Sequence, residues 1–571
     1  MFRQNAKRVS LLIGLITLNI GLILSVMQWQ TINAQTAVVP DVFNEFTIDP
    51  TYEYTLSPVG NYQTGIFDEG AAEIVAHDPV SQNLYVVNGA SVTVDILSIG
   101  NAGDLTLSRQ IPITMYGGTN LNSLAFQDGV LAVAAEIEAN DVHSRGLVIF
   151  FDRQDTVLAT AEVGYLPDMV TFTPDGTKVI VANEGEPSPD YTFDPEGSIS
   201  IVDISGGVAT ITSSNVTEIN FTDFNEGGSR HAELDPSIRI YGPGASVAQD
   251  LEPEYIAVSP DSATAYVTLQ ENNALAVIDL NTNTLTALVP LGTKDHSLRR
   301  NAFDPSDDDG GIMIASWPVY GMYQPDSIVT YSTTNGVYLL TANEGDARDY
   351  DGYSEEERMA DLTLDPTVYP LADILQQDQY LGRLRTTSAT GDTDGDGDVD
   401  QLYSYGARSF SIWAADGSLV YDSGSEFEQL LAITDPAHFN SNNDDNDSFD
   451  NRSDDKGPEP EALAIGEVDG RMFAFIGFER MGGIVIYDIT DPTQPFIVSY
   501  FNYRNFAVDA EDTATIDLGP EGFKFITAAE SPLGEPLIAV ANEVSGSTSL
   551  YRFTQPTPRA FIPVVLQATA P

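Results

Sequence analysis

The sequence contains no cysteine and few basic residues. Without cysteine it can form no disulfide, no thiolate metal site and no cysteine nucleophile. Its 25 Lys and Arg residues are set against 84 Asp and Glu residues, which gives a formal net charge of −59. Because such a charge repels polyanions, we expect neither nucleic acid nor an anionic membrane surface as a partner, and cations or cationic partners are favoured.

Recognisable catalytic motifs are also missing. The sequence has no nucleophile elbow, no phosphate-cradling glycine loop and no dinucleotide fingerprint. The histidines show no paired metal-ligand spacing; they are His77, His143, His231, His296 and His438. Hydrophobic residues make up 42% of the chain, which is enough for a packed core. The composition therefore indicates a folded protein without an evident reaction.

The N-terminus has the pattern of a secretion signal. Arg3, Lys7 and Arg8 precede an apolar stretch from Val9 to about Met27, and Ala34 offers a small residue for cleavage. We therefore predict a signal peptide over residues 1–34, a linker over 35–51 and a protein that is secreted or held in the cell envelope. The alternative is an uncleaved membrane anchor, since the stretch approaches the ~20 residues that span a bilayer.

A repeat of one strand pattern organises the rest of the chain. Each copy has a first apolar run opened by an acidic or polar residue, then a turn, a second run, a third run and a weaker fourth strand. The seven first runs begin at Glu73, Asn122, Asp168, Glu254, Asp326, Glu461 and Glu521. Each copy is expected to form a four-stranded antiparallel blade.

Such blades bury both faces only when they stack around an axis. The sequence therefore predicts an all-β fold, a seven-bladed β-propeller over residues 52–556, followed by a tail over 557–571. The last copy ends at Phe553 without a local fourth strand. Tyr52 to Val59 could supply that strand, so that the N-terminal strand closes the ring.

Acidic residues recur at two positions of the repeat. Six open first strands, at Glu73, Asp168, Glu254, Asp326, Glu461 and Glu521. Six more close second strands, at Glu136, Glu184, Glu271, Glu344, Glu479 and Glu543. In an antiparallel pair the start of one strand lies beside the end of its partner, so both sets should meet at one mouth of the central channel.

The long insertions are expected on the same face. They are residues 185–197, 222–250, 293–323, 345–405 and 436–458. Crowded carboxylates repel one another unless cations, Arg partners or raised pKa values relieve the repulsion. Calcium is the cofactor we expect, because it is a hard cation that prefers oxygen ligands. The alternative is that these acids only accept backbone hydrogen bonds and organise turns.

The insertion 345–405 contains the sharpest metal signal. Asp392, Asp394, Asp396, Asp398 and Asp400 alternate with other residues, and Gly397 takes the sixth position, as in the first half of an EF-hand calcium loop. Position twelve is Tyr403 and lacks the usual Glu. We predict calcium binding of modest affinity here; the alternative is a solvated acidic loop. The acidic runs at 307–309 and 444–455 are weaker candidates.

Five of the 25 basic residues lie close to these acids in the sequence. They are Arg348, Arg408, Arg452, Lys456 and Arg480. Two roles are open for them. They could neutralise the acids in buried salt bridges, or they could clamp an anionic group such as phosphate beside calcium.

Several segments resemble the choice-of-anchor I family of bacterial secreted and surface propellers, which is related to animal mesenchyme-specific cell surface glycoproteins. These segments are residues 68–74, 340–349, 405–410, 457–461 and 519–522, and the resemblance extends from Tyr52 to Phe553. It implies a propeller of the YVTN and nitrite-reductase-like type outside the cytoplasm. It supplies no established reaction, although some relatives carry phosphatase or phytase-like labels.

Two functional hypotheses follow. The first is a calcium-binding propeller that recognises an unknown extracellular ligand or surface component through its acidic, loop-rich face. The second is a calcium-dependent phosphoester hydrolase of phosphatase or phytase-like type. In the hydrolase, Glu184, Glu344 and Glu461 would hold calcium while Arg348 and Arg408 stabilise the developing charge. A hydrolase needs these arginines free to face substrate, whereas a recognition surface allows them to be consumed in ion pairs.

Overall fold

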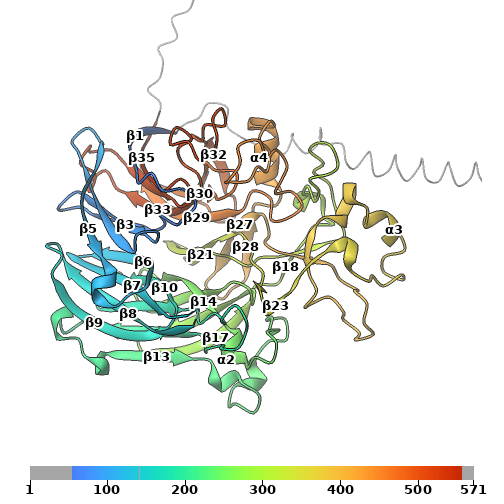
Figure 1. The fold of residues 1–571 in the computed structure, drawn as a ribbon, viewed down its shortest axis with the longest axis horizontal. Helices are drawn as coiled ribbons and strands as arrows, with labels where there is room; N and C mark the ends of the chain where they lie inside the picture. Colours follow the sequence, from blue (N-terminus) through green and yellow to red (C-terminus); the bar gives the residue numbers. More distant parts are fainter. Residues whose placement is uncertain (1–53, 141, 556–571) are drawn as a thin grey trace, which may run out of the picture.

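The computed structural model describes residues 54–140 and 142–555. The predicted signal peptide, linker and C-terminal tail lie outside these residues. The described chain is all-β, and most of its strands form four-stranded antiparallel sheets (Figure 1). Within the described ranges, no helix combines the length and apolar character needed to cross a bilayer.

The first sheets follow the predicted repeat. Sheet one contains β2 (Val75–Asp78), β3 (Asn83–Asn88), β4 (Thr93–Ile99) and β5 (Leu105–Pro112). Sheet two contains β6 (Asn120–Gln127), β7 (Val130–Glu138), β8 (His143–Asp152) and β9 (Val157–Tyr165). Sheet three contains β10 (Pro167–Phe172), β11 (Lys178–Asn183), β12 (Ser198–Asp203) and β13 (Val216–Asn220). Sheet four contains β14 (Pro253–Val258), β15 (Thr264–Leu269), β16 (Ala274–Asp279) and β17 (Thr284–Pro290).

The remaining four-stranded sheets carry the long insertion and the chain ends. Sheet five contains β20 (Ile328–Thr333), β21 (Gly336–Asn343), β27 (Ser409–Ala414) and β28 (Leu419–Asp422). Sheet six contains β29 (Pro460–Val468), β30 (Arg471–Phe478), β31 (Ile484–Asp488) and β32 (Phe496–Phe501). Sheet seven contains β33 (Pro520–Ile526), β34 (Leu537–Asn542), β35 (Ser547–Thr554) and β1 (Thr55–Gln63).

The N-terminal strand β1 completes the last sheet. It pairs antiparallel with β35, with Thr55 opposite Thr554 and Gln63 opposite Ser547. The strand runs over residues 55–63, whereas its sequence-based range is 52–59. The first described strand therefore lies beside the last, as Figure 1 shows.

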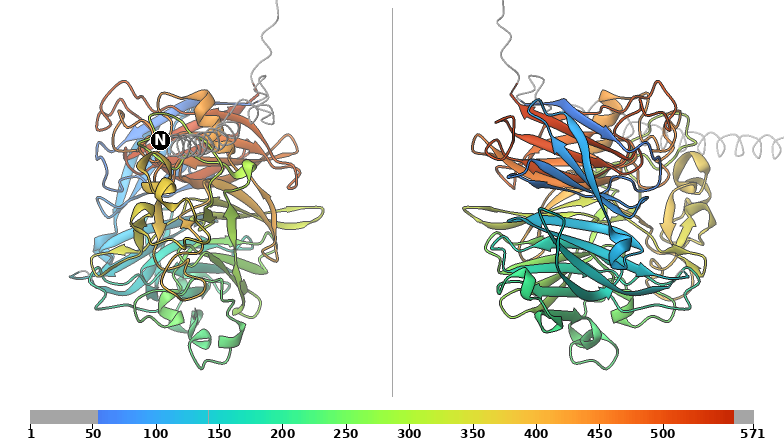
Figure 2. Two further views of the ribbon diagram at one scale, coloured as in Figure 1. Left: turned by 90° about the vertical axis from the view of Figure 1, so that its right-hand side faces the viewer. Right: turned by 60° about the vertical axis from the view of Figure 1, so that its left-hand side comes forward.

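The insertions form smaller elements that contact one another. Their strands are β18 (Thr293–Asp295), β19 (Tyr320–Met322), β22 (Asp349–Tyr350), β23 (Tyr353–Ser354), β24 (Glu356–Arg358), β25 (Arg385–Thr387) and β26 (Tyr403–Ser404). The α-helices in the described part of the chain are α2 (Val247–Asp250), α3 (Ala372–Leu375) and α4 (Glu426–Thr434). Figure 2 shows the insertion around α3, in yellow, gathered at one side of the sheets. Backbone hydrogen bonds from Gly352 to Pro189 and from Arg385 to Asp454 join three of the insertions.

Hydrophobic layers between neighbouring sheets form the core. One layer combines Ile180 of sheet three with Val267 of sheet four, and another combines Leu340 of sheet five with Ile476 of sheet six. Equivalent buried clusters join the other consecutive sheets. Sheets two to six are thereby covered on both faces, which explains why their middle strands are apolar without clear alternation.

Buried asparagines connect second and third strands at the same place in three sheets. Asn183 donates from its Nδ2 to Ser198 and Ser200, and Asn343 donates in the same way to Ser409 and Ser411. Asn542 donates to Ser547 in sheet seven. Since a buried amide must find hydrogen-bond partners, this recurring contact fixes the end of strand two, directly before the predicted acid.

We expect the substitution Leu56→Ala to destabilise the protein far more than Leu107→Ala. Leu56 of β1 is 2% exposed and packs in the layer between sheets six and seven, whereas Leu107 of β5 is 39% exposed. Truncating a buried Leu lowers the free energy of unfolding by about 2–5 kcal/mol. Truncating the exposed Leu107 should lower it by less than about 1 kcal/mol. Thermal unfolding of both variants measures the difference. Equal losses would show that β1 is not part of the cooperative core.

Candidate functional site

A β-bulge shifts the pairing at the predicted first-strand acids in four sheets. In sheet three the pairing moves from Pro167 opposite Asn183 to Val170 opposite Val181, so the bulge contains Asp168. The same shift encloses Glu254, Glu461 and Glu521, each directly after a proline. A bulge re-aims side chains and is common at functional sites. The Pro–acid pair therefore starts the strand and sets the direction of its carboxylate.

The two acid sets meet across neighbouring sheets. Carboxylate oxygens of Glu184, which follows β11, lie within 4.8 Å of those of Glu254 and Glu271 in sheet four. A second group of the same kind contains Asp326, Glu344 and Glu461, from sheets five and six. A third combines Glu344 and Glu479 with Glu459. Acids far apart in the sequence thus share oxygen-rich sites.

The group Glu184, Glu254 and Glu271, named here the open acid cluster, combines two buried acids, Glu254 and Glu271, with the half-buried Glu184. Glu254 is 7% exposed and Glu271 3% exposed. One carboxylate oxygen of each, Oε2, has no hydrogen-bond partner among the described residues. Over the described ranges, none of the three acids forms an ion pair with Lys, Arg or His. Buried oxygens in this state are available to a cation.

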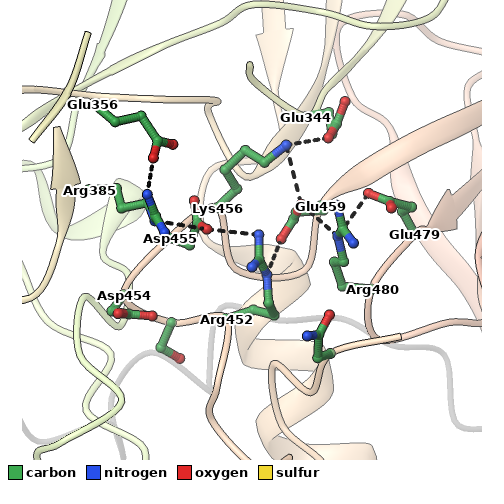
Figure 3. A network of polar contacts seen from close by, with 12 residues as sticks. Glu344, Glu356, Arg385, Arg452, Asp454, Asp455, Lys456, Glu459, Glu479 and Arg480 are labelled. Carbon is green, nitrogen blue, oxygen red and sulfur yellow. Dashed lines mark hydrogen bonds and ion pairs between the residues drawn. The ribbon is translucent and has the colours of Figure 1, made fainter. Parts of the chain in front are cut away.

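A second group of acids, around Glu459, is neutralised by bases, as Figure 3 shows. Glu459 accepts from Arg452 at 2.7 Å, Arg480 at 3.2 Å and Lys456 at 3.3 Å. Lys456 also pairs with Glu344, and Arg480 with Glu479 at 3.2 Å. Although burial alone would raise the pKa of Glu459, the positive charges of Arg452, Lys456 and Arg480 hold that pKa well below its usual range. This carboxylate is therefore ionised and consumed by its partners.

The open acid cluster has the opposite electrostatics. Burial, followed by the charge of Glu271, raises the pKa of Glu254 well above its usual range. Burial and the charge of Glu186 also raise the pKa of Glu184, and burial raises that of Glu271 although the positive charge of Arg348 opposes it. A carboxylate in such surroundings takes up a proton or binds a cation. Ionised, this cluster would supply three oxygen ligands to a hard metal ion.

Other members of the predicted rings follow the same trend. Burial and the charges of Glu543 and Asp168 raise the pKa of Glu73 to about 9. Burial and the charge of Glu344 raise the pKa of Asp326, and burial and the charge of Glu521 raise that of Glu461. The partners of Glu73 and Glu461 come from other sheets, whereas Asp326 and Glu344 flank two strands of sheet five. The structure therefore brings these acids near one another.

Glu136 is the predicted ring acid whose contacts differ most. It lies in β7, where its Oε1 is 2.9 Å from His143 Nδ1. Its carboxylate groups with those of Glu138 and the ring of His143. The side-chain hydrogen bond to Glu136 raises the pKa of His143. Glu136 is thus partnered by a histidine that sequence spacing alone does not connect to it.

The predicted arginines are consumed in buried contacts. Arg348 is 2% exposed; it pairs with Asp250 and with Glu252 at 2.8 Å and lies over the ring of Tyr241. Arg408 is 3% exposed and donates to Glu428 at 2.7 Å. It also donates to the carbonyl oxygens of Asp304, Ser453 and Asp455. Both guanidinium groups therefore act as internal braces between insertions.

The calcium-type loop is ordered largely by its own hydrogen bonds. Asp392 accepts from the backbone N–H of Gly395 at 2.6 Å and of Gly397 at 3.0 Å. Both glycines have positive φ, at 80° and 98°, which other residues rarely adopt. Asp398 and Asp400 group with Asp365, whose carboxylate lies within 4.8 Å. Asp365 is a possible ligand from outside the twelve-residue pattern.

Sequence reasoning missed two acids that lie beside the predicted ring acids, and a third beside the calcium-type loop. Glu252 and Glu459 each precede a proline and a ring acid, in the sequence Glu-Pro-Glu at 252–254 and 459–461. Glu252 pairs with Arg348 as Glu459 pairs with Arg452. The repeated tripeptide was the available signal. Its first Glu forms an ion pair with an Arg, and its second is the predicted ring acid. Asp365 had no comparable local pattern.

Comparison with known proteins identifies a family model and partial relatives. The model of the choice-of-anchor I domain matches residues 73–492. Gigasin-3a of Magallana gigas is 35% identical over 188 residues, which is 31% of this chain and 66% of that protein. The mesenchyme-specific cell surface glycoprotein of Strongylocentrotus purpuratus is 27% identical over 220 residues, covering 33% of this chain and 28% of that protein. The chain thus spans less than two thirds of the length of either relative.

Solved structures with a similar chain path are distant in sequence. The WD40 domain of Toxoplasma gondii coronin is 10% identical, with a TM-score of 0.43, and the alignment covers 90% of each chain.

The substitution Arg408→Ala should strongly destabilise the fold. It would leave Glu428, which is 2% exposed, buried without its cation, and breaking a buried pair costs about 3–5 kcal/mol. The matched control is Arg145→Ala, because the side chain of Arg145 is 35% exposed in its pairs with Glu162 and Glu218. Loss of this exposed arginine should lower the free energy of unfolding by less than about 1 kcal/mol. Chemical denaturation compares the variants, and similar losses would contradict the bracing role.

The substitution Glu73→Gln tests the raised pKa. A group whose pKa is higher in the folded than in the unfolded protein adds stability at any pH below its unfolded-state pKa. That contribution is lost as the pH rises through the folded-state pKa, which for Glu73 is about 9. Metal-free protein should therefore lose stability between about pH 5 and pH 9, and Glu73→Gln should lose less. We expect the variant to melt ~1–2 °C above the parent at pH 9 and within ~1 °C of it at pH 5. Parallel pH profiles would contradict burial of this acid.

Proposed function

Since this chain belongs to the choice-of-anchor I family and is a surface-associated β-propeller module, we propose that it binds calcium at its acidic mouth and uses that face for recognition. The observation that carries the proposal is the open acid cluster, where buried carboxylate oxygens lack partners. The ligand we propose is an extracellular molecule or surface component that meets the calcium-loaded face.

The proposal includes a closed ring of seven blades. In its support, the described residues form seven four-stranded sheets, and β1 lies in the last of them. A buried layer that contains Val86 of sheet one and Leu537 of sheet seven lies between the first and last sheets. A ring closed in this way leaves no sheet face exposed at either end.

Calcium fits the open acid cluster better than other common metals. The cluster offers only carboxylate oxygens, and Ca²⁺ accepts six to eight oxygen ligands in flexible geometry. Three acidic side chains supply part of that number, and water or a bound ligand would supply the rest. The absence of cysteine removes thiolate ligands, which softer metals prefer.

Recognition is favoured over phosphoester hydrolysis by the state of the arginines. A hydrolase would present Arg348 and Arg408 to substrate, yet both are buried in ion pairs with Glu252 and Glu428. The other bases at the mouth, Arg452, Lys456 and Arg480, converge on Glu459. A face whose bases are paired internally attracts cations and not phosphate groups.

We expect calcium to stabilise chelator-treated protein and Glu254→Gln to remove most of that effect. Calcium at 100 times its Kd stabilises by about 2.7 kcal/mol, and that should raise Tm by ~2–3 °C in a chain of this size. Glu254→Gln should weaken calcium binding at least ~tenfold, because it removes a charged ligand. Calorimetric titration with calcium chloride and thermal unfolding provide the two measurements.

Glu196→Gln is the matched control, since Glu196 is exposed and the change of charge is the same. It should bind calcium as the parent does. If Glu254→Gln also bound as the parent, the open acid cluster would not be the site. Calcium-dependent turnover of a panel of phosphomonoesters and phosphodiesters by the parent would favour the hydrolase instead.

A further inference from the structure

A large cavity lies beside the calcium-type loop, away from the open acid cluster. Its volume is about 1170 Å³, and two insertions form its walls, residues 295–320 and 368–401. We name it the insertion cavity. It is bounded on one side by α3 and the segment before it, and on the other by Thr393 to Gln401. Cavities of this size hold drug-sized ligands.

The walls of the insertion cavity are aromatic and aliphatic. Trp317 and Tyr380 lie with their ring centroids 6.2 Å apart, and Tyr369 adds a third aromatic side chain. Trp317 is held in place because its Nε1 donates to the carbonyl oxygen of Phe303 at 3.1 Å. Behind the walls, Leu364, Leu381 and other buried residues form the separate hydrophobic core of the insertion. The walls are therefore built on a packed support.

Apolar side chains are exposed at the edge of this cavity. Val368 is 49% exposed and Leu371 38% exposed, and both line it. Ile374 and Leu375 continue the same surface inward along α3. Exposed apolar residues gathered around a concave site, in place of single scattered ones, mark a binding surface.

The charged side chains that line the insertion cavity are all acidic. Asp295, Asp394 and Asp400 line it, and no Lys, Arg or His is among the described residues that do. Asp400 also belongs to the group with Asp365 and Asp398, and Asp394 to the predicted calcium loop, so Asp295 and, in calcium-free protein, Asp394 are the acids open to another ligand. The whole chain, at a net charge of −59, adds attraction for cations.

We propose that the insertion cavity binds an amphipathic organic cation. Its apolar body would lie against Trp317, Leu371 and Ile374, and its cationic group would lie near Asp295 and Asp394. Tryptophan is the best aromatic partner for such a cation, and a quaternary ammonium group is bound by aromatic rings and carboxylates together. An anionic ligand with the same body would meet only repulsion. This binding is independent of calcium at the open acid cluster.

The test uses three probes with the same ten-carbon tail: decyltrimethylammonium, decyl maltoside and decyl sulfate, each below its micellar concentration. Calorimetric titration into the whole protein is run in chelator, so that calcium bound at Asp398 and Asp400 does not contribute. We expect the cation to bind at least ~tenfold more tightly than the sulfate, with the maltoside between them. Equal binding of the three probes would overturn the charge argument.

Two pairs of variants place the binding in this cavity. Val368→Arg should weaken decyltrimethylammonium binding at least ~tenfold, by filling the entrance and adding a like charge. Val80→Arg is its control, since Val80 is 74% exposed and is not among the lining residues. Asp394→Asn should weaken binding ~threefold, whereas Asp351→Asn, an exposed acid outside the lining, should leave it unchanged.

All four variants change residues that are not buried, so their thermal unfolding should match that of the parent. If Val368→Arg and Val80→Arg reduced binding equally, the probe would be attracted only by the net charge of the protein, and the proposal would be wrong. Loss of binding in Val368→Arg alone, with the parent Tm, supports the cavity.

Discussion

Burial of carboxylates at one end of the sheets is the constraint on which the rest of this structure depends. An ionised carboxylate in a low-dielectric setting is costly unless a counter-charge or hydrogen bonds compensate it. Among these acids, Glu459 has three basic partners. Glu254 and Glu271 form no ion pair among the described residues, and burial raises their pKa values. This asymmetry is the basis of the proposed cation site.

The same short sequence element builds both the scaffold and the site. A proline opens the first strand, the acid after it sits in a bulge, and the next residues enter the hydrophobic layer between sheets. The asparagine at the end of strand two is clamped to serines of strand three, directly before the second acid. Packing and function are thus coupled, because the contacts that fix the strands also fix the carboxylates.

The strands were largely predictable, since local patterns set them. First strands, turn signals and the pairing of an N-terminal strand with the last sheet agree with the structure, although β1 is shifted to 55–63. The presence of acids at two repeat positions was also readable. The sequence did not show which acids would have partners: Glu252 meets Arg348 across 96 residues, and Glu344 meets Lys456 across 112 residues. No local pattern encodes such a distance.

By itself, the sequence determined the charge, the absence of thiol chemistry, the repeated hairpins and the family of the chain. These properties depend on composition and on neighbours within a few residues. Only the tertiary structure decided which carboxylates are neutralised, that Arg348 and Arg408 are braces, and that two insertions enclose an aromatic cavity beside Asp394. Those outcomes depend on which distant segments the stacked sheets bring together, because an ion pair or a cavity exists only where separate parts of the chain meet.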